Sequence, residues 1–107
     1  MEVEVSKEFK DYLDGLFDAI VMLETKEECE KFFLDLCTVR ELELMGQRLE
    51  VAKLLKSRYT YSEIEEMTGA STATISRVNR SLQYGESGYD LVLEDLILKD
   101  IEEEKDK

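Results

Sequence analysis

The stretch from Ser71 to Tyr84 carries two arginines and an asparagine but no acidic residue. If this stretch is a helix, one face presents side chains that are either small or long and hydrogen-bond-donating, namely Thr72, Ala73, Ser76, Arg77, Asn79 and Arg80. Small residues let a helix come close to the floor of the DNA major groove, whereas Arg and Asn donate hydrogen bonds to base edges or phosphates. These residue types therefore indicate a DNA-binding face.

The formal net charge of −12 argues at first against an anionic partner, but the acids are unevenly placed. Residues 1–39 hold eleven acids and four lysines, and residues 85–107 hold nine acids and three lysines. Residues 40–84 hold seven basic and six acidic residues. Because salt screens charges over ~8 Å at physiological ionic strength, acids on a distant face oppose phosphate binding only weakly. The alternative explanation for the acid-free stretch is packing against an acidic partner protein.

Two short helices joined at Gly69 are predicted to hold this face, the first over 61–68 and the second over 72–83. Glycine readily takes the left-handed conformation of such a turn, and Ser71 is a suitable N-cap for the second helix. A helix-turn-helix needs apolar contacts where its helices cross. The residues expected to face inward are Ile64, Met67, Ala70, Ile75 and Val78. A plain helical hairpin with a polar surface, the alternative, predicts the mixture of Glu and Lys found elsewhere in the chain.

Capping signals predict an all-α fold around these two helices. Three capping boxes occur, beginning at Thr25, Thr38 and Thr60, and the chain has no proline. Apolar residues recur at helical spacing, so that the six expected helices cover about 6–22, 26–36, 39–57, 61–68, 72–83 and 89–103. The second helix is expected to bury Cys29, Phe32, Phe33 and Leu36, and the third to carry an apolar stripe of Leu42, Met45, Leu49, Ala52 and Leu55.

The composition argues against several other classes of protein. The chain has no histidine and two cysteines, Cys29 and Cys37, which excludes the common zinc ligand sets and removes the commonest general base. We expect both thiols to be small buried hydrophobes, kept reduced in the cytoplasm. No nucleotide-binding or hydrolase motif occurs, and no apolar run approaches ~20 residues. We therefore expect no catalytic residue, no metal and no membrane segment.

Two stretches, GASTATISRVNRSL (69–82) and LCTVRELELMGQR (36–48), resemble the Trp repressor family and its YerC/YecD-like branch. The likeness covers about residues 33–84. It implies a cytoplasmic homodimer that binds double-stranded DNA as a repressor, with an intertwined six-helix fold. It also implies a single domain over 1–107, in which 1–57 and 89–103 supply the dimerisation helices and 60–84 the helix-turn-helix. The implied DNA-binding residues are Ser71, Thr72, Ala73, Thr74, Ser76, Arg77, Asn79 and Arg80.

The same resemblance implies a small-molecule corepressor site. The matching positions are Thr38, Arg48, Arg77 and Ser81, and flat guanidinium groups would stack on an aromatic ring and pair with a carboxylate. Val78, however, stands where the family has a glycine beneath the indole, which argues against L-tryptophan as the ligand. An ion pair of the two arginines with Glu43 or Glu50 is the structural alternative.

The first helix of the motif also departs from the family. Ser62 and Glu65 occupy positions that are basic on the DNA-facing side of the repressor. The loss of basic contacts weakens the salt-dependent part of DNA affinity, unless Lys56 and Arg58 substitute for them. An interaction module that kept this fold but lost DNA binding is therefore the alternative function.

Overall fold

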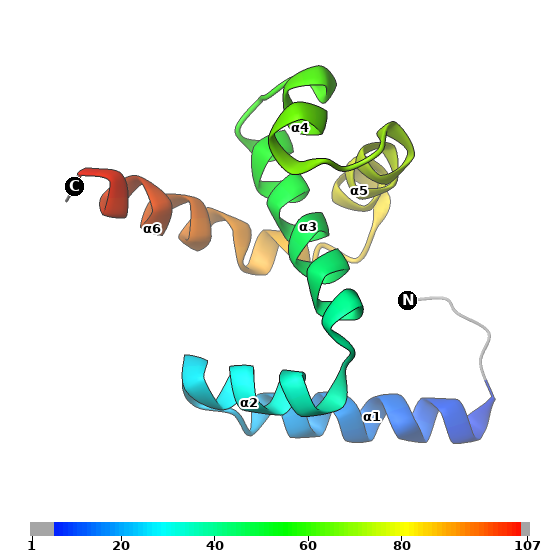
Figure 1. Cartoon of the computed structure of the whole chain (residues 1–107). Helices are drawn as coiled ribbons and strands as arrows, with labels where there is room; N and C mark the ends of the chain where they lie inside the picture. The colour runs from blue at the N-terminus through cyan, green and yellow to red at the C-terminus, as the bar shows by residue number, and fades with distance from the viewer. Residues whose placement is uncertain (1–5, 106–107) are drawn as a thin grey trace. The chain divides into compact units, whose positions relative to one another are not determined.

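The computed structural model describes residues 6–105 and contains six α-helices and no strand within that range, which confirms the predicted all-α class (Figure 1). A single 3-10 turn, η1, precedes the last helix. The described residues fall into two compact units, divided between Leu42 and Glu43, with α3 running from the first into the second. The helices are α1 (Lys7–Val21), α2 (Lys26–Leu36), α3 (Val39–Lys56), α4 (Tyr61–Thr68), α5 (Thr72–Tyr84) and α6 (Leu93–Lys105), with η1 at Tyr89–Leu91.

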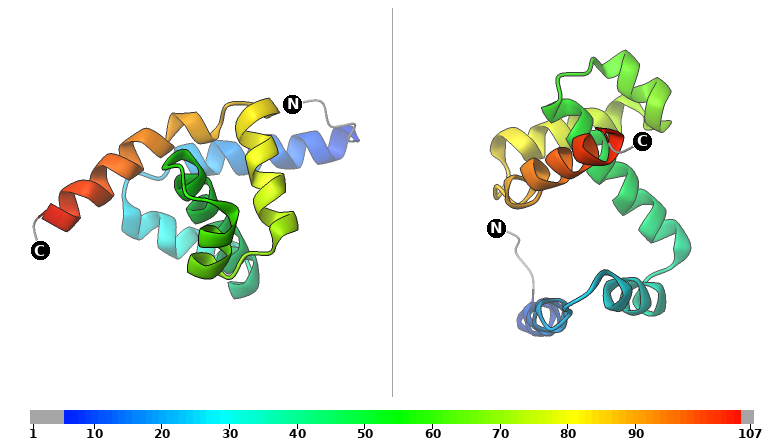
Figure 2. Two further views of the ribbon diagram at one scale, coloured as in Figure 1. Left: turned by 90° about the horizontal axis from the view of Figure 1, so that it is seen from above. Right: turned by 90° about the vertical axis from the view of Figure 1, so that its left-hand side faces the viewer.

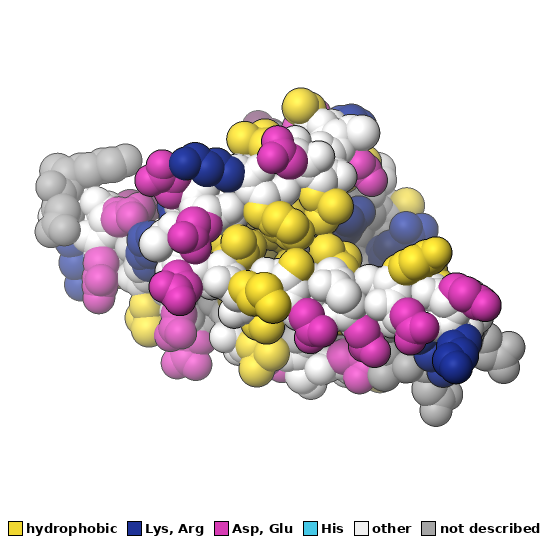
Figure 3. Space-filling view, turned by 90° about the horizontal axis from the view of Figure 1, so that it is seen from below, with side chains coloured by type: hydrophobic (Ala, Val, Ile, Leu, Met, Phe, Trp, Pro, Cys, Tyr) yellow, Lys and Arg dark blue, Asp and Glu magenta, His cyan; other side chains and the backbone are white. Residues whose placement is uncertain are grey.

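The first unit is built on α1 and α2, which lie antiparallel and side by side (Figures 1 and 2). None of its described side chains is buried, because two helices alone cannot enclose a core. The expectation that α2 buries Leu36 is therefore wrong, since this side chain is 52% exposed, while Cys29, Phe32 and Phe33 are only half-buried. Figure 3 shows exposed hydrophobic side chains of the chain among its acidic ones.

The second unit encloses one small apolar core. Its fully or nearly fully buried members are Val51, Ala52, Leu54, Ile64, Ala70, Ile75, Val78 and Leu93. The apolar stripe predicted for α3 is confirmed in part. Ala52 is buried and Leu49 and Leu55 pack against the core, but Met45 is exposed. The buried face is wider than one stripe because α3 contacts neighbours on more than one side. Gln47 donates to the Thr68 carbonyl on α4 (3.2 Å), and the core also includes Leu93 of α6.

Two of the three predicted capping boxes close completely. At Thr60 the hydroxyl accepts from the Glu63 amide (3.2 Å), and the Glu63 carboxylate accepts from the Thr60 amide (2.9 Å). Thr38 and Glu41 do the same at the start of α3. In each box the backbone N–H of the threonine lowers the pKa of the glutamate, since it stabilises the charged form.

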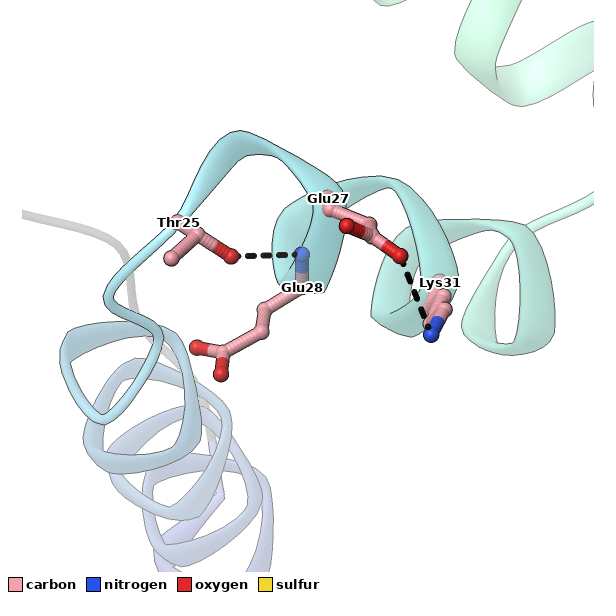
Figure 4. Close-up of polar contacts among 4 residues, drawn as sticks. All are labelled: Thr25, Glu27, Glu28 and Lys31. Carbon is pink, nitrogen blue, oxygen red and sulfur yellow. Dashed lines mark hydrogen bonds and ion pairs between the residues drawn. The ribbon is translucent and has the colours of Figure 1, made fainter.

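The third box closes differently. Thr25 accepts from the Glu28 amide (3.1 Å; Figure 4), but the Glu28 carboxylate accepts from the amide of Glu24 rather than from that of Thr25. Glu27 forms an exposed ion pair with Lys31 one turn along α2. The cap therefore satisfies two backbone donors at the start of α2, as a capping box does, with the register of the second bond shifted by one residue.

The last helix begins later than predicted. We expected it to start at residue 89, but η1 occupies Tyr89–Leu91 and α6 begins at Leu93, the first residue after Val92 and itself a core residue. Lys53 of α3 forms an ion pair with Asp100 of α6 (2.6 Å). The hydrogen bond to this carboxylate raises the pKa of Lys53. The helix was expected to end at about residue 103, whereas it continues to Lys105, the last described residue.

Candidate nucleic-acid interface

The turn between α4 and α5 is built as the sequence predicts. Gly69 takes the left-handed conformation (φ 74°), and its amide donates to the Glu65 carbonyl (2.9 Å). The Thr68 hydroxyl donates to the Ile64 carbonyl (2.7 Å) and accepts from the Ala70 amide (3.1 Å), so that α4 is closed by side-chain and backbone bonds together. The two helices pack against each other (Figure 2), with Ile64 and Ile75 fully buried.

Met67 does not take part in this contact, contrary to our expectation. Its side chain is 56% exposed and lines a shallow groove beside Ile97 and Ile101 of α6. Ile64 and Ala70, rather than Met67, are the buried residues of this stretch.

Ser71 begins α5 as predicted and orients Thr74. The Ser71 hydroxyl oxygen accepts from the Thr74 amide (3.1 Å), and its proton is directed to the Thr74 hydroxyl oxygen (3.0 Å). Both residues therefore have a structural role at the start of the helix, besides their predicted part in binding DNA.

The outer face of α5 presents the remaining predicted residues together. Thr72, Ala73, Ser76, Arg77 and Arg80 are exposed, and Asn79 is half-buried. Neither Arg77 nor Arg80 forms an ion pair with any residue between 6 and 105, so both guanidinium groups are available to a ligand. The face therefore combines free cationic donors with small side chains, as a helix that enters the major groove requires.

One contact on this face was not predicted from the sequence. The Thr72 hydroxyl, in the first turn of α5, donates to the carboxylate of Glu65 on α4. Glu65 is half-buried, and Thr72 is exposed. The pair places a negative charge at the N-terminal end of α5, where the positive end of the helix dipole favours it.

The two basic residues before the motif differ in their surroundings. Lys56 forms an ion pair with Asp90 (3.3 Å), so the charge of this lysine is already paired within the chain. Arg58 is exposed and has no ion pair within the described part of the chain. Its φ of 68° lies in the left-handed region, where a side chain is strained. Arg58 is thus the better placed of the two to contact a phosphate.

The predicted corepressor residues are divided between the two units. Thr38 belongs to the first unit and serves as the cap of α3. Arg48, Arg77 and Ser81 belong to the second unit and are exposed. Ser81 lines an open hollow of about 510 Å³ whose walls include Leu49, Tyr89 and Val92.

The burial of Val78 and the surroundings of Arg48 and Arg77 bear on the predicted corepressor site. Val78 is only 2% exposed and belongs to the core, so its side chain takes up space inside the second unit rather than lying on its surface. Neither Arg48 nor Arg77 forms an ion pair with another described residue, and Glu50 pairs with Lys53 instead (3.1 Å). The ion-pair alternative for the two arginines is therefore not observed in residues 6–105.

Among residues 6–105, no three His, Cys, Asp or Glu side chains are grouped so that they could hold a metal ion. No described helix is long and apolar enough to cross a membrane.

Comparison with known proteins agrees with this geometry. Residues 11–97 match the profile of the Trp repressor protein family. The chain is 54% identical over 82 residues to YerC, an uncharacterized protein of Bacillus subtilis strain 168, and this match spans 77% of the chain and 79% of YerC. A proposed Trp repressor from Staphylococcus aureus has a crystal structure that matches with a TM-score of 0.76 at 53% identity, over 86% of this chain and 95% of that one. A TrpR-like protein from Eubacterium eligens matches with the same TM-score and identity over 80% and 89%.

Proposed function

We propose, from the premise that this chain belongs to the Trp repressor family, that it is a sequence-specific transcriptional regulator that reads the DNA major groove with α5. The family consists of regulatory DNA-binding proteins rather than enzymes. The observation that carries the proposal for this chain is the exposed outer face of α5, where Arg77 and Arg80 have no partner among the described residues. The residues proposed to meet DNA are Ser71, Thr72, Ala73, Thr74, Ser76, Arg77, Asn79 and Arg80.

The protein is further proposed to act in the cytoplasm as a homodimer, and as a repressor that blocks a promoter. Support for a dimer comes from large apolar side chains of α1 and α2 that stay exposed in one chain, among them Phe9, Phe17 and Leu34. A second copy would cover such surface, which a small monomer cannot. We assign dimerisation to 1–57 and 89–103, and the helix-turn-helix to 60–84. Two reading helices would then enter major grooves about one helical turn, ~34 Å, apart.

The acidic residues of α4 favour a second candidate function. Glu65 contacts the proposed reading helix through Thr72, Glu66 follows it on α4, and the net charge is −12. Such charges suit a module that binds another protein rather than DNA. The two functions differ in one measurable property, which is affinity for duplex DNA at low salt.

The deciding experiment is selection of fragmented genomic DNA by the purified full chain, with and without L-tryptophan, at low and physiological salt. Enriched palindromic sites would support the regulator, and their spacing would report the separation of the two reading helices. A dependence on L-tryptophan would identify it as a corepressor. If no fragment is enriched even at low salt, the regulator proposal fails and the protein-binding function gains support. Sedimentation of the same sample tests the dimer independently.

A further inference from the structure

We infer that Glu65, held by Thr72, determines base specificity: it selects a base that carries an exocyclic amino group in the major groove, cytosine or adenine. This inference rests on the proposed function, since it concerns which sequence α5 reads. It starts from the hydrogen bond between the Thr72 hydroxyl and the Glu65 carboxylate. That bond connects α4 to the first turn of α5, which is the part of a recognition helix that contacts base edges.

The pair of Thr72 and Glu65 can accept hydrogen bonds from a base but cannot donate them. The only proton of the Thr72 hydroxyl is donated to Glu65, so the threonine oxygen can only accept a further hydrogen bond. The ionised carboxylate has no proton either, and its second oxygen is free to accept. The pair therefore offers acceptors and no donor to a base.

The four bases differ in what they offer such a pair. Cytosine presents its N4 amino group and adenine its N6 amino group in the major groove. Guanine presents two acceptors, and thymine presents an acceptor and a methyl group. An acceptor-only pair therefore attracts cytosine or adenine and repels guanine and thymine. The arginines farther along α5, Arg77 and Arg80, have the opposite character, so the reading face changes from acceptor to donor along the helix.

A purely structural role for Glu65 makes a different prediction. A carboxylate near the start of a helix stabilises that helix through its dipole, and any removal of its charge would raise DNA affinity for all sequences alike. Glu66, its exposed neighbour on α4, provides the matched control, since Glu66→Gln removes the same charge from the next position of α4 without touching Thr72.

The test is selection from a random duplex library by the wild type, Glu65→Gln and Glu66→Gln, with thermal unfolding to confirm that each variant is folded. We expect wild-type sites to contain, in each half-site, one position restricted to cytosine or adenine. Glu65→Gln should accept guanine or thymine there, because its amide can also donate, whereas Glu66→Gln should keep the wild-type preference. If both variants keep that preference and change only the overall affinity, the inference is overturned.

A change on the DNA side tests the same contact, and its first measurement uses the wild-type protein alone. The amino group at the restricted position is removed by using 2-pyrimidinone for cytosine or unsubstituted purine for adenine. The wild type should lose about tenfold in affinity, the usual effect of one lost base contact, and Glu65→Ala should lose nothing further from the same replacement. An equal loss in both proteins would overturn the inference. If the wild type enriches no sequence at all, the proposed function fails, which is a different outcome from sequence-specific binding that ignores Glu65.

Discussion

The amide of Tyr59 donates to the carbonyl of Leu54 (3.1 Å), and this bond closes α3 around a left-handed residue, Arg58. The Arg58 amide donates in turn to the Leu55 carbonyl (3.1 Å). The two bonds form a Schellman motif, in which glycine is the usual left-handed residue. An arginine in that place costs conformational energy, and strain of this kind is often kept where a side chain is needed for function.

Replacement of Arg58 by glycine should therefore separate stability from binding. We expect Arg58→Gly to raise the free energy of unfolding by about 1 kcal/mol, since glycine removes the left-handed strain. DNA binding should weaken, with the slope of log K against log salt reduced by about one if Arg58 contacts a phosphate. Urea denaturation and fluorescence anisotropy at several salt concentrations measure the two effects.

Ser87 is the matched control, because it is the other described non-glycine residue with positive φ (63°). Ser87→Gly should stabilise the fold by a similar amount and leave DNA affinity unchanged. An Arg58→Gly variant that binds DNA like the wild type would show that the arginine is not a phosphate contact.

Arg80 should act as a phosphate contact on α5. Its guanidinium is exposed and has no ion pair within residues 6–105. Arg80→Ala should weaken binding to all sequences alike and reduce the salt slope by about one, since one fewer counterion is released. Gln83→Ala, at another exposed position of α5, should leave the slope unchanged. A slope that is the same in wild type and Arg80→Ala would contradict the assignment.

The capping box at the start of α4 should make folding sensitive to acid. The Thr60 amide lowers the pKa of Glu63 below its usual 4.5 in the folded state. Between the folded-state pKa and 4.5, the unfolded chain binds more protons than the folded chain. This contribution to stability is therefore present above pH 4.5 and is lost as the pH falls through the folded-state pKa. Glu63→Gln should flatten the dependence of unfolding free energy on pH in this acid range, whereas Thr60→Ser should retain it. An unchanged pH dependence in Glu63→Gln would show that the box contributes nothing to it.

Local rules in the sequence predicted the turn but not the tertiary surroundings of several residues. Gly69 and Ser71 act within one turn of their own helices, so their roles follow from residue type and spacing. The spacing of three residues predicts that Met67 lies on the same side of α4 as Ile64, yet its side chain is 56% exposed, so spacing did not predict its burial. The bond between Glu65 and Thr72 joins two helices through side chains seven residues apart, a contact that no periodicity predicts.

The core position of Val78 leads to a stability prediction. Val78 is 2% exposed and packs with Val51, Ile64 and Ile75. Val78→Gly should lower the free energy of unfolding by about 3 kcal/mol, because it leaves a cavity and places glycine within a helix. Gln83→Gly, at an exposed position of the same helix, isolates the glycine effect of about 1 kcal/mol. Equal losses in the two variants would show that Val78 contributes no packing.

The same valine leads to a prediction about ligands. If Val78 fills the space that an indole ring would need, L-tryptophan should leave the thermal midpoint of the wild type unchanged. Val78→Gly should open space near Arg48 and Arg77, so that L-tryptophan raises its midpoint, because a ligand that binds only the folded state stabilises it. Val78→Gly, Arg77→Ala is the control, since loss of the guanidinium removes a stacking and pairing partner. A midpoint that does not rise in Val78→Gly at millimolar L-tryptophan would contradict the placement of an aromatic ligand at these residues.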